Sequence, residues 1–418
     1  MRMWAKSTTG AVLMAGFVAF GSGVGYADTT SGDSSAASGN QVQAPISAPV
    51  NVGGNAGTVG GQSAAKTKGG STVKNVDHGG PGNRTSGDGG AGSGNQVYAP
   101  VSAPVDVSGN ALSAGGQAAA RSKGGASVSN HYNGSTDQRT SGDGGLLSGN
   151  QAVAPISAPI SACGNAVSIF GQAAAECVGG AKVVNKGGGT GTTNGDGGAL
   201  SGNQLFAPIS APVSICGNAL AVAGQSFAAC EGGAKVVNRG GQGATTSGER
   251  GAIAGNQAYV PISAPIDICG NAGSLFGQAA AGCTGGASVV NAGSDSGAAR
   301  RMRTAAGKDG PTTSGDGSLL GGNQLIAPIS APINICGNAL AVAGQAFAAC
   351  EGGASVRNKD VADHMKTSGD GSAGGGNQVY APVSLPVNIC GNALAVAGQA
   401  AAMCEGGASV HNGSDGDA

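Results

Sequence analysis

Ten cysteines are the residues of this chain whose type and spacing could do chemistry. They form five pairs in which the second cysteine follows fourteen positions after the first: Cys163/Cys177, Cys216/Cys230, Cys269/Cys283, Cys336/Cys350 and Cys390/Cys404. An even number of cysteines in an exported chain predicts disulfides, one for each pair. Each bridge would close a loop of about 15 residues, which is worth roughly 3 kcal/mol in the chain-entropy model. The spacing leaves open whether the bridges form within a chain or between chains.

Other chemistry is disfavoured by the rest of the reactive residues. The four histidines are scattered rather than clustered, and no C-x-x-C motif occurs, so a metal site is not expected. The histidines are His78, His131, His364 and His411. The repeated serines, such as Ser210, have no histidine at a repeated position that could activate them. The sequence therefore predicts a protein that is not an enzyme and uses no cofactor, metal or small-molecule substrate.

The cysteine pairs belong to a stretch of about 37 residues that occurs seven times. The fourth copy reads GNQLFAPISAPVSICGNALAVAGQSFAACEGGAKVVN, and the first two copies carry Gly53/Thr67 and Ser108/Ser122 in place of the cysteines. The predicted repeats are residues 39–75, 94–130, 149–185, 202–238, 255–291, 322–358 and 376–412. Self-similarity at this period indicates a repeat array rather than one globular core.

Composition supports the same conclusion. Glycine supplies 83 of the 418 residues, and aromatic residues are only 3%. A chain so poor in large side chains has little to offset its backbone entropy, so its stability must come from disulfides, stacking or assembly. The net charge of −1 gives no indication of a nucleic-acid partner.

Within a repeat, the first half alternates with period two. Leu205, Ile209, Val213 and Ile215 lie on one side of an extended strand, and serines and Cys216 lie on the other. Fourteen of the sixteen prolines occupy two positions of this segment, four residues apart, so that both remove a donor from the same edge. A polyproline-type linker is the alternative interpretation. We expect the aliphatic side to face air or lipid and the serine side to remain wetted.

A turn at Gly224-Gln225 would bring each pair of sulfurs together, and a further strand is expected over Ala234–Asn238. The predicted fold is mainly β: tandem small β-hairpin or meander repeats, mostly disulfide-stapled, joined by flexible Gly/Ser-rich linkers that include the recurring TSGDG. Uncharged segments such as NALAVAG favour amyloid-like cross-β on assembly, with asparagine and glutamine ladders from GNQ and CGN.

The first 27 residues resemble a secretory signal, with Arg2 and Lys6 before an apolar run and small residues before Asp28. No later apolar run is long enough for a transmembrane helix. The predicted location is therefore outside the cell.

The string PVSLPVNICGN and its sister copies, such as PISAPVSICGN, resemble the chaplin family of filamentous actinobacteria. The resemblance covers every repeat. It implies a secreted, surface-active protein that assembles at air–water interfaces into amyloid-like fibrils and coats aerial hyphae and spores. The chain differs in its shorter segment between the cysteines and its larger number of repeats. Its C-terminal HNGSDGDA carries no sorting motif, so we expect non-covalent association with the cell wall.

Two functions follow as expectations. The first is self-assembly, alone or with related surface proteins, into a hydrophobic coat that also aids attachment. The alternative is a soluble adhesin in which the repeats, as a β-solenoid or as beads on a string, bind a cell-wall polysaccharide at several points.

Overall fold

The computed structural model describes residues 29–77, 83–132, 138–186, 191–239, 244–293, 311–359, 361 and 365–413. The expected signal sequence lies outside the described residues, as do His78 and His364. The described residues form 49 β-strands and no helix. The prediction of a mainly β repeat protein is confirmed.

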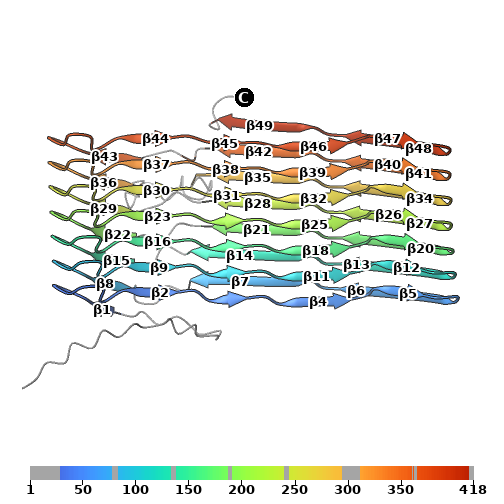
Figure 1. Cartoon of the computed structure of the whole chain (residues 1–418), viewed down its shortest axis with the longest axis horizontal. Helices are drawn as coiled ribbons and strands as arrows, with labels where there is room; N and C mark the ends of the chain where they lie inside the picture. The colour runs from blue at the N-terminus through green and yellow to red at the C-terminus, as the bar shows by residue number, and fades with distance from the viewer. Residues whose placement is uncertain are drawn as a thin grey trace, which may run out of the picture.

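Each copy, together with a strand from the spacer before it, forms one rung of seven strands, and the seven rungs are stacked as a flattened β-solenoid (Figure 1). The strands of the fourth rung are β22 (Gly191–Asn194), β23 (Gln204–Phe206), β24 (Ile209–Ser210), β25 (Val213–Cys216), β26 (Ala219–Ala221), β27 (Gln225–Glu231) and β28 (Ala234–Arg239). We call β23 to β26 and their equivalents the outgoing arm, and β27 and β28 and their equivalents the return arm.

The end rungs repeat this order. The first rung holds β1 (Thr29–Ser31), β2 (Gln41–Gln43), β3 (Ile46–Ser47), β4 (Val50–Gly53), β5 (Ala56–Thr58), β6 (Gln62–Lys68) and β7 (Ser71–Asp77). The last rung holds β43 (Lys366–Ser368), β44 (Gln378–Tyr380), β45 (Val383–Ser384), β46 (Val387–Cys390), β47 (Ala393–Ala395), β48 (Gln399–Glu405) and β49 (Ala408–Gly413).

Every strand pairs with its equivalents in the neighbouring rungs, in parallel and in register. Cys216, for example, lies between Cys163 and Cys269, and Asn238 lies between Asn185 and Asn291. The result is seven sheets of seven strands, each sheet built from one strand of every rung. Like residues therefore form columns that run along the whole stack.

The pairing within a repeat differs from the predicted hairpin. The chain does turn just before Gln225, where Val222 to Gly224 form a bend, and β28 covers the expected further strand. However, β26 and β27 contact each other through side chains and direct their backbone hydrogen bonds to other rungs. Stacking like strands satisfies both edges of each strand, whereas an isolated hairpin would leave two edges open.

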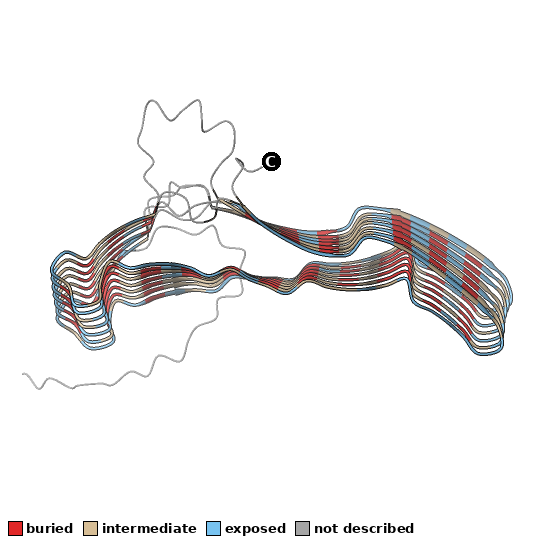
Figure 2. Ribbon diagram, turned by 90° about the horizontal axis from the view of Figure 1, so that it is seen from above, coloured by how far each residue is buried: buried red, intermediate tan, exposed pale blue. Residues whose placement is uncertain are grey.

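The two arms enclose an interior of small side chains, which Figure 2 shows as bands of buried residues along the stack. One column is built from alanines, such as Ala219 and Ala272, and another from valines, such as Val183 and Val236. Small side chains allow the arms to approach closely, and each methyl group packs against its copy in the next rung. On the outgoing arm, Phe206 and Tyr259 of neighbouring rungs stack with their ring centroids 5.5 Å apart.

The prolines lie inside the sheets, so the polyproline linker is not the structure adopted here. They separate β23, β24 and β25, yet the residue after each proline still pairs: Val213 N–H donates to the carbonyl of Pro159, at 2.9 Å. Each proline thus removes one ladder donor and leaves its carbonyl as an acceptor.

Part of each predicted flexible spacer is ordered. TSGDG and the segments equivalent to it form a strand of one sheet, as in β29 (Thr245–Ser247). The buried hydroxyl of Thr246 donates to the carbonyl of Gly255 at 2.6 Å, and this bond recurs in every rung. The threonine therefore fixes the return of the chain into the outgoing arm. The spacers differ in length, so equivalent residues of neighbouring rungs are between 53 and 67 residues apart in the sequence. The register of the strands is nevertheless the same.

Candidate functional site

The predicted cysteine pairs lie opposite each other across the arms, one pair in each of the third to seventh rungs. Each pair is a disulfide within its own rung, with S–S distances of 2.03 to 2.15 Å and Cα–Cα distances of 5.8 to 5.9 Å. From the third rung to the seventh, the bridges are Cys163–Cys177, Cys216–Cys230, Cys269–Cys283, Cys336–Cys350 and Cys390–Cys404. In this structure, each bridge joins two cysteines of the same chain.

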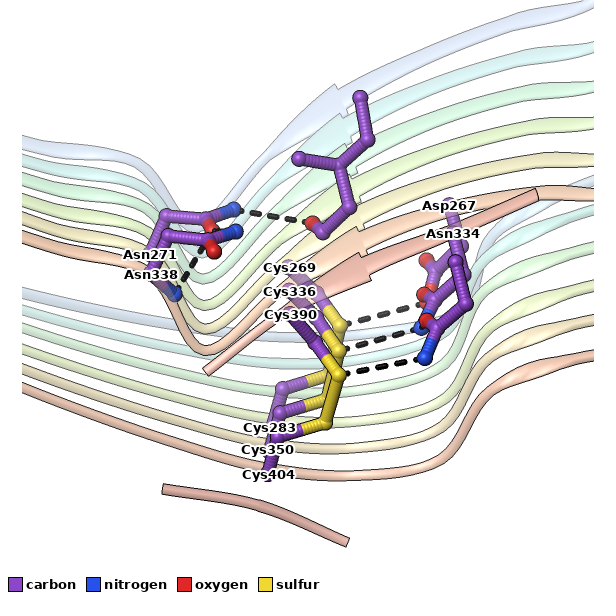
Figure 3. Close-up of a disulfide and its surroundings, with 12 residues drawn as sticks. Asp267, Cys269, Asn271, Cys283, Asn334, Cys336, Asn338, Cys350, Cys390 and Cys404 are labelled. Carbon is purple, nitrogen blue, oxygen red and sulfur yellow. Dashed lines mark hydrogen bonds between the residues drawn. A yellow bond between two sulfur atoms is a disulfide. The ribbon is translucent and has the colours of Figure 1, made fainter. Parts of the chain in front are cut away.

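The bridges form one column along the stack (Figure 3). Those of the third to sixth rungs are almost fully buried: Cys336 is 0% exposed and Cys350 is 3% exposed. Sulfurs of neighbouring rungs, such as Cys177 and Cys230, come within 4.8 Å, but oxidised sulfurs do not offer the thiolates that bind metals. The column is therefore a structural element rather than a reactive one.

The two rungs without cysteines fill the same column differently. In the second rung, the hydroxyls of Ser108 and Ser122 are 2.7 Å apart and hydrogen-bonded. In the first rung, a Cβ on Gly53 would lie only 3.2 Å from Oγ1 of Thr67. The column thus remains closed by polar or small groups where the bridge is missing.

The glycine after the first cysteine allows the arms to come together. Gly217 has a φ of +64°, and a Cβ at this position would lie 2.7 Å from Cβ of Cys230. In the sixth rung, a Cβ on Gly337 would likewise lie 2.9 Å from Cβ of Cys350. Both the left-handed backbone and the close approach require glycine here. The CGN motif is therefore needed for the geometry of the bridge.

Asparagine and glutamine columns tie the rungs together, as predicted from GNQ and CGN. The Asn218 side chain donates to Oδ1 of Asn165 in the rung before and to the carbonyl of Ile268 in the rung after, both at 3.0 Å. The buried amide of Asn238 donates to Oδ1 of Asn291 at 2.7 Å and to the hydroxyl of Ser263 at 3.1 Å. Because Ser263 lies on the outgoing arm of the next rung, this column also joins the two arms.

A column of polar side chains lies beside the disulfides. Asn334 and Asn388 each donate an amide N–H to a sulfur of their own rung, Cys336 and Cys390, at 3.1 Å. The fifth rung has Asp267 at this position, with one carboxyl oxygen 3.2 Å from Sγ of Cys269 and the other without a hydrogen-bond partner among the described residues (Figure 3). Burial raises the pKa of Asp267 to about 7. A carboxyl that remains protonated can donate to the sulfur as the asparagines do.

Replacing Asp267 by asparagine should stabilise the solenoid at neutral pH and have little effect at acid pH. Below its ordinary pKa of 3.8 the carboxyl is neutral in both states, but between that pH and about 7 it ionises only in the unfolded chain. The resulting penalty is on the order of 4 kcal/mol at pH 7. Urea midpoints of D267N and the parent chain at pH 3 and pH 7 measure the difference.

The reverse substitution in the next rung is the matched control. Asn334→Asp should lower the urea midpoint at pH 7 and leave it unchanged at pH 3, because it introduces the same buried acid. Equal shifts at both pH values for either variant would contradict a titrating carboxyl.

An acidic column follows the TSGDG segments. The hydroxyl of Ser141 and the N–H of Asp143 both donate to Oδ1 of Asp88 in the preceding rung, at 2.5 and 2.9 Å. The same serine donation, from Ser86, lowers the pKa of Asp33 at the exposed end of the column. Burial instead raises the pKa of Asp143 in the middle of the stack. Backbone and hydroxyl donors thus hold like charges in one row.

The outer face of the outgoing arm is aliphatic along the whole stack. Leu205, Ile209, Val213 and Ile215 and their equivalents point away from the interior and are half-buried or exposed. Ile329 is 37% exposed. We call this surface the aliphatic face. Its outward orientation agrees with the expectation, but the serine side does not remain wetted.

The serine side of the outgoing arm is buried between the arms. Ser210 and Ser214 are at most 1% exposed, and Ser210 accepts a hydrogen bond from the amide of Asn185 at 3.1 Å. The return arm has a mixed outer surface: Glu231 and Lys235 point outward from it, and Phe227 is also exposed there. The expectation failed because polar groups can be buried when a ladder satisfies each of them.

The chain is similar to two chaplins of Streptomyces coelicolor. It is 34% identical to Chaplin-B over 112 residues and 31% identical to Chaplin-C over 103 residues. These alignments cover 24% and 18% of this chain, and 47% and 40% of the relatives, so the chain spans less than half of their length. The ChpA-C family model matches residues 21–75, 72–128, 126–185, 179–238, 232–289, 299–356 and 354–409. The chain belongs to the chaplin family.

Both predictions, the resemblance to the chaplin family and the presence of seven repeats, are therefore confirmed for this chaplin. No solved structure matches it. Among the described residues, the chaplin has no helix with the length and apolar character needed to cross a membrane.

Three features of the site were missed from the sequence. The hydrogen bond of Thr246 and the acidic column through Asp143 both lie in segments that composition assigns to linkers. The signal was present: TSGDG recurs beside four of the seven repeats, and a linker does not need a fixed sequence. The polar column that includes Asp267 carries no signal, because asparagine, aspartate and serine alternate in it without a pattern.

Proposed function

We propose that this chaplin is exported and acts at the cell surface as a surface-active structural protein. It adsorbs at boundaries between water and air, assembles into an amyloid-like film, and gives aerial hyphae or spores a water-repellent coat that also aids attachment. Family membership supports the structural role, and the aliphatic face supports the interfacial one.

The aliphatic face is the observation that carries the proposal. A side chain of this size gains about 1.5–3 kcal/mol when it leaves water completely. Because most of these side chains are already about two thirds covered, roughly a third of this free energy remains available. Summed over four columns and the seven rungs, adsorption of one chain gains on the order of 20 kcal/mol. Charged side chains of the return arm, such as Glu231 and Lys235, favour contact with water on the opposite side.

Assembly has a structural basis in the stack itself. Parallel, in-register strands with asparagine and glutamine columns are the arrangement that amyloid uses between chains. Here one chain contains seven such layers, and the outer edges of the first and last rungs have no strand partner among the described residues. Unpaired edges of this kind bind further strands.

The proposal is tested by spreading the secreted protein on water and measuring surface tension and thioflavin-T fluorescence. We expect a large fall in tension and a rise in fluorescence as the film matures. Surface tension that stays at the value of water would reject the function, whatever the fluorescence shows.

A second candidate function is multivalent binding of a wall polysaccharide. The β-solenoid favours it, since a groove of about 850 Å³ runs along the stack beside the asparagine and glutamine columns of β23 and its equivalents. Apolar side chains such as Leu200 and Leu205 line much of this groove, which suits a glycan poorly. Saturable sedimentation of the monomeric protein with purified cell walls would favour this function over the first.

A further inference from the structure

The two ends of the solenoid carry opposite charge in the same column. The last residues of β6, of β48 and of their equivalents stand in one row along the outer surface of the return arm. From the first rung to the last, the row reads Lys68, Lys123, Val178, Glu231, Thr284, Glu351 and Glu405. Lys68 and Glu405 are both exposed.

We propose that the first rung of one chain docks on the last rung of a second copy, head to tail and in register, with Lys68 of one copy beside Glu405 of the other. The proposal rests on the assembly proposed above and specifies its geometry. The junction continues all seven sheets, so β1 to β7 of one copy pair with β43 to β49 of the next.

The structure contains a precedent for such a pair. Arg121 and Glu176 are equivalent residues of neighbouring rungs on the outer surface of the return arm, and Nε of Arg121 lies 3.0 Å from a carboxylate oxygen of Glu176. One step along a column therefore brings opposite charges into contact. Lys68 and Glu405 would be separated by the same single step.

An unpaired amide at the first rung is a second, independent observation. Gln41 is 7% exposed, and its Nε2 has no hydrogen-bond partner among the described residues. In the second to sixth rungs the equivalent Nε2 donates to the glutamine of the rung before, as Gln96 does to Gln41 at 2.8 Å. In the proposed junction, Gln378 of the second copy lies where it can accept a hydrogen bond from Nε2 of Gln41.

The remaining charged neighbours at the junction are known from the columns. Asp33 would lie beside Asp370, so two carboxylates would meet. The N–H of Asp33 and the hydroxyl of Ser31 are equivalent to the groups of Asp143 and Ser141 that donate to Asp88, and could donate to Asp370 in the same way. Lys74 would stand beside His411. The Lys68–Glu405 pair is thus the attractive contact between unlike charges, and it disfavours an end-to-end arrangement that would place two Glu405 carboxylates together.

The missing cysteines of the first rung fit the same junction. Gly53 and Thr67 would stack on the Cys390–Cys404 bridge. Without a thiol on the docking rung, the bridge of the neighbouring copy has no partner for disulfide exchange at the contact. The proposed junction therefore contains no covalent link.

Seeded elongation tests the proposal on the full secreted chain. Sonicated fibrils are mixed with monomer of the same protein at low ionic strength, and thioflavin-T follows growth. We expect Glu405→Lys and Lys68→Glu each to slow elongation about three- to ten-fold, and the double variant to grow at the parent rate. An equimolar mixture of the two single variants should also recover, because each then meets the opposite charge at both ends.

Glu231→Lys is the matched control, since it changes the same column in the interior of the stack and should leave the rate unchanged. Far-UV circular dichroism of each monomer checks that the solenoid forms. If both single variants elongate at the parent rate, the docking geometry is overturned while the proposed film-forming function stands. If the parent protein forms neither film nor fibril, both are overturned.

Discussion

Replacing one outward column of the aliphatic face by threonine should weaken adsorption at the air–water boundary by at least about a hundredfold. The seven residues of the column are Ile46, Val101, Ile156, Ile209, Ile262, Ile329 and Val383. These side chains retain on average roughly 40% of a transfer free energy of about 1.5–3 kcal/mol each, so the column contributes roughly 5 kcal/mol. Threonine keeps the β-branched shape that suits the sheet and removes much of this gain.

The measurement is the surface pressure reached at each bulk concentration, from which the adsorption constant is obtained. The control changes a polar column on the outer surface of the return arm to threonine, which its first member, Thr72, already is: Ser127, Lys182, Lys235, Ser288, Ser355 and Ser409. This variant should adsorb like the parent chain. Equal losses in the two variants would mean that adsorption does not depend on which face meets the air.

The alternation of the fourth repeat was sufficient to identify the aliphatic face from the sequence. Ile209 and Val213 are separated by small residues and prolines, so only one orientation of the strand places the large side chains together. The partner of that strand could not be identified in the same way. A hairpin and a stack of like rungs both keep Cys216 near Cys230, and only the backbone hydrogen bonds distinguish them.

The buried serines show why the interior was harder to predict. Ser210 and Ser214 are polar residues on the side of a strand opposite to aliphatic ones, which normally indicates a solvated face. Their burial depends on partners outside their own repeat: Asn185, which donates to Ser210, is 25 residues away in the neighbouring rung. A single repeat, read alone, contains no information about that contact.

Reduction of the bridges should produce the largest loss of stability. Each bridge closes a loop of about 15 residues and is worth roughly 3 kcal/mol, so breaking all five costs on the order of 10 kcal/mol when partial overlap between neighbouring rungs is allowed for. The cysteines of the third to sixth rungs, from Cys163 to Cys350, are at most 5% exposed, so the reductant must act on opened chains. Urea midpoints with and without reductant, after complete reduction verified by mass spectrometry, measure the effect.

The chain itself supplies the matched variants for this experiment. Replacing Cys216 and Cys230 by serine creates the hydroxyl pair that already joins Ser108 and Ser122 in the second rung, and should cost about 3 kcal/mol without opening the column. Changing Ser108 and Ser122 to cysteine should add a sixth bridge and a similar gain. If reduction left the midpoint unchanged, the amide columns alone would hold the rungs together. That result would contradict the chain-entropy argument, because bridges that restrict the unfolded chain must raise the midpoint.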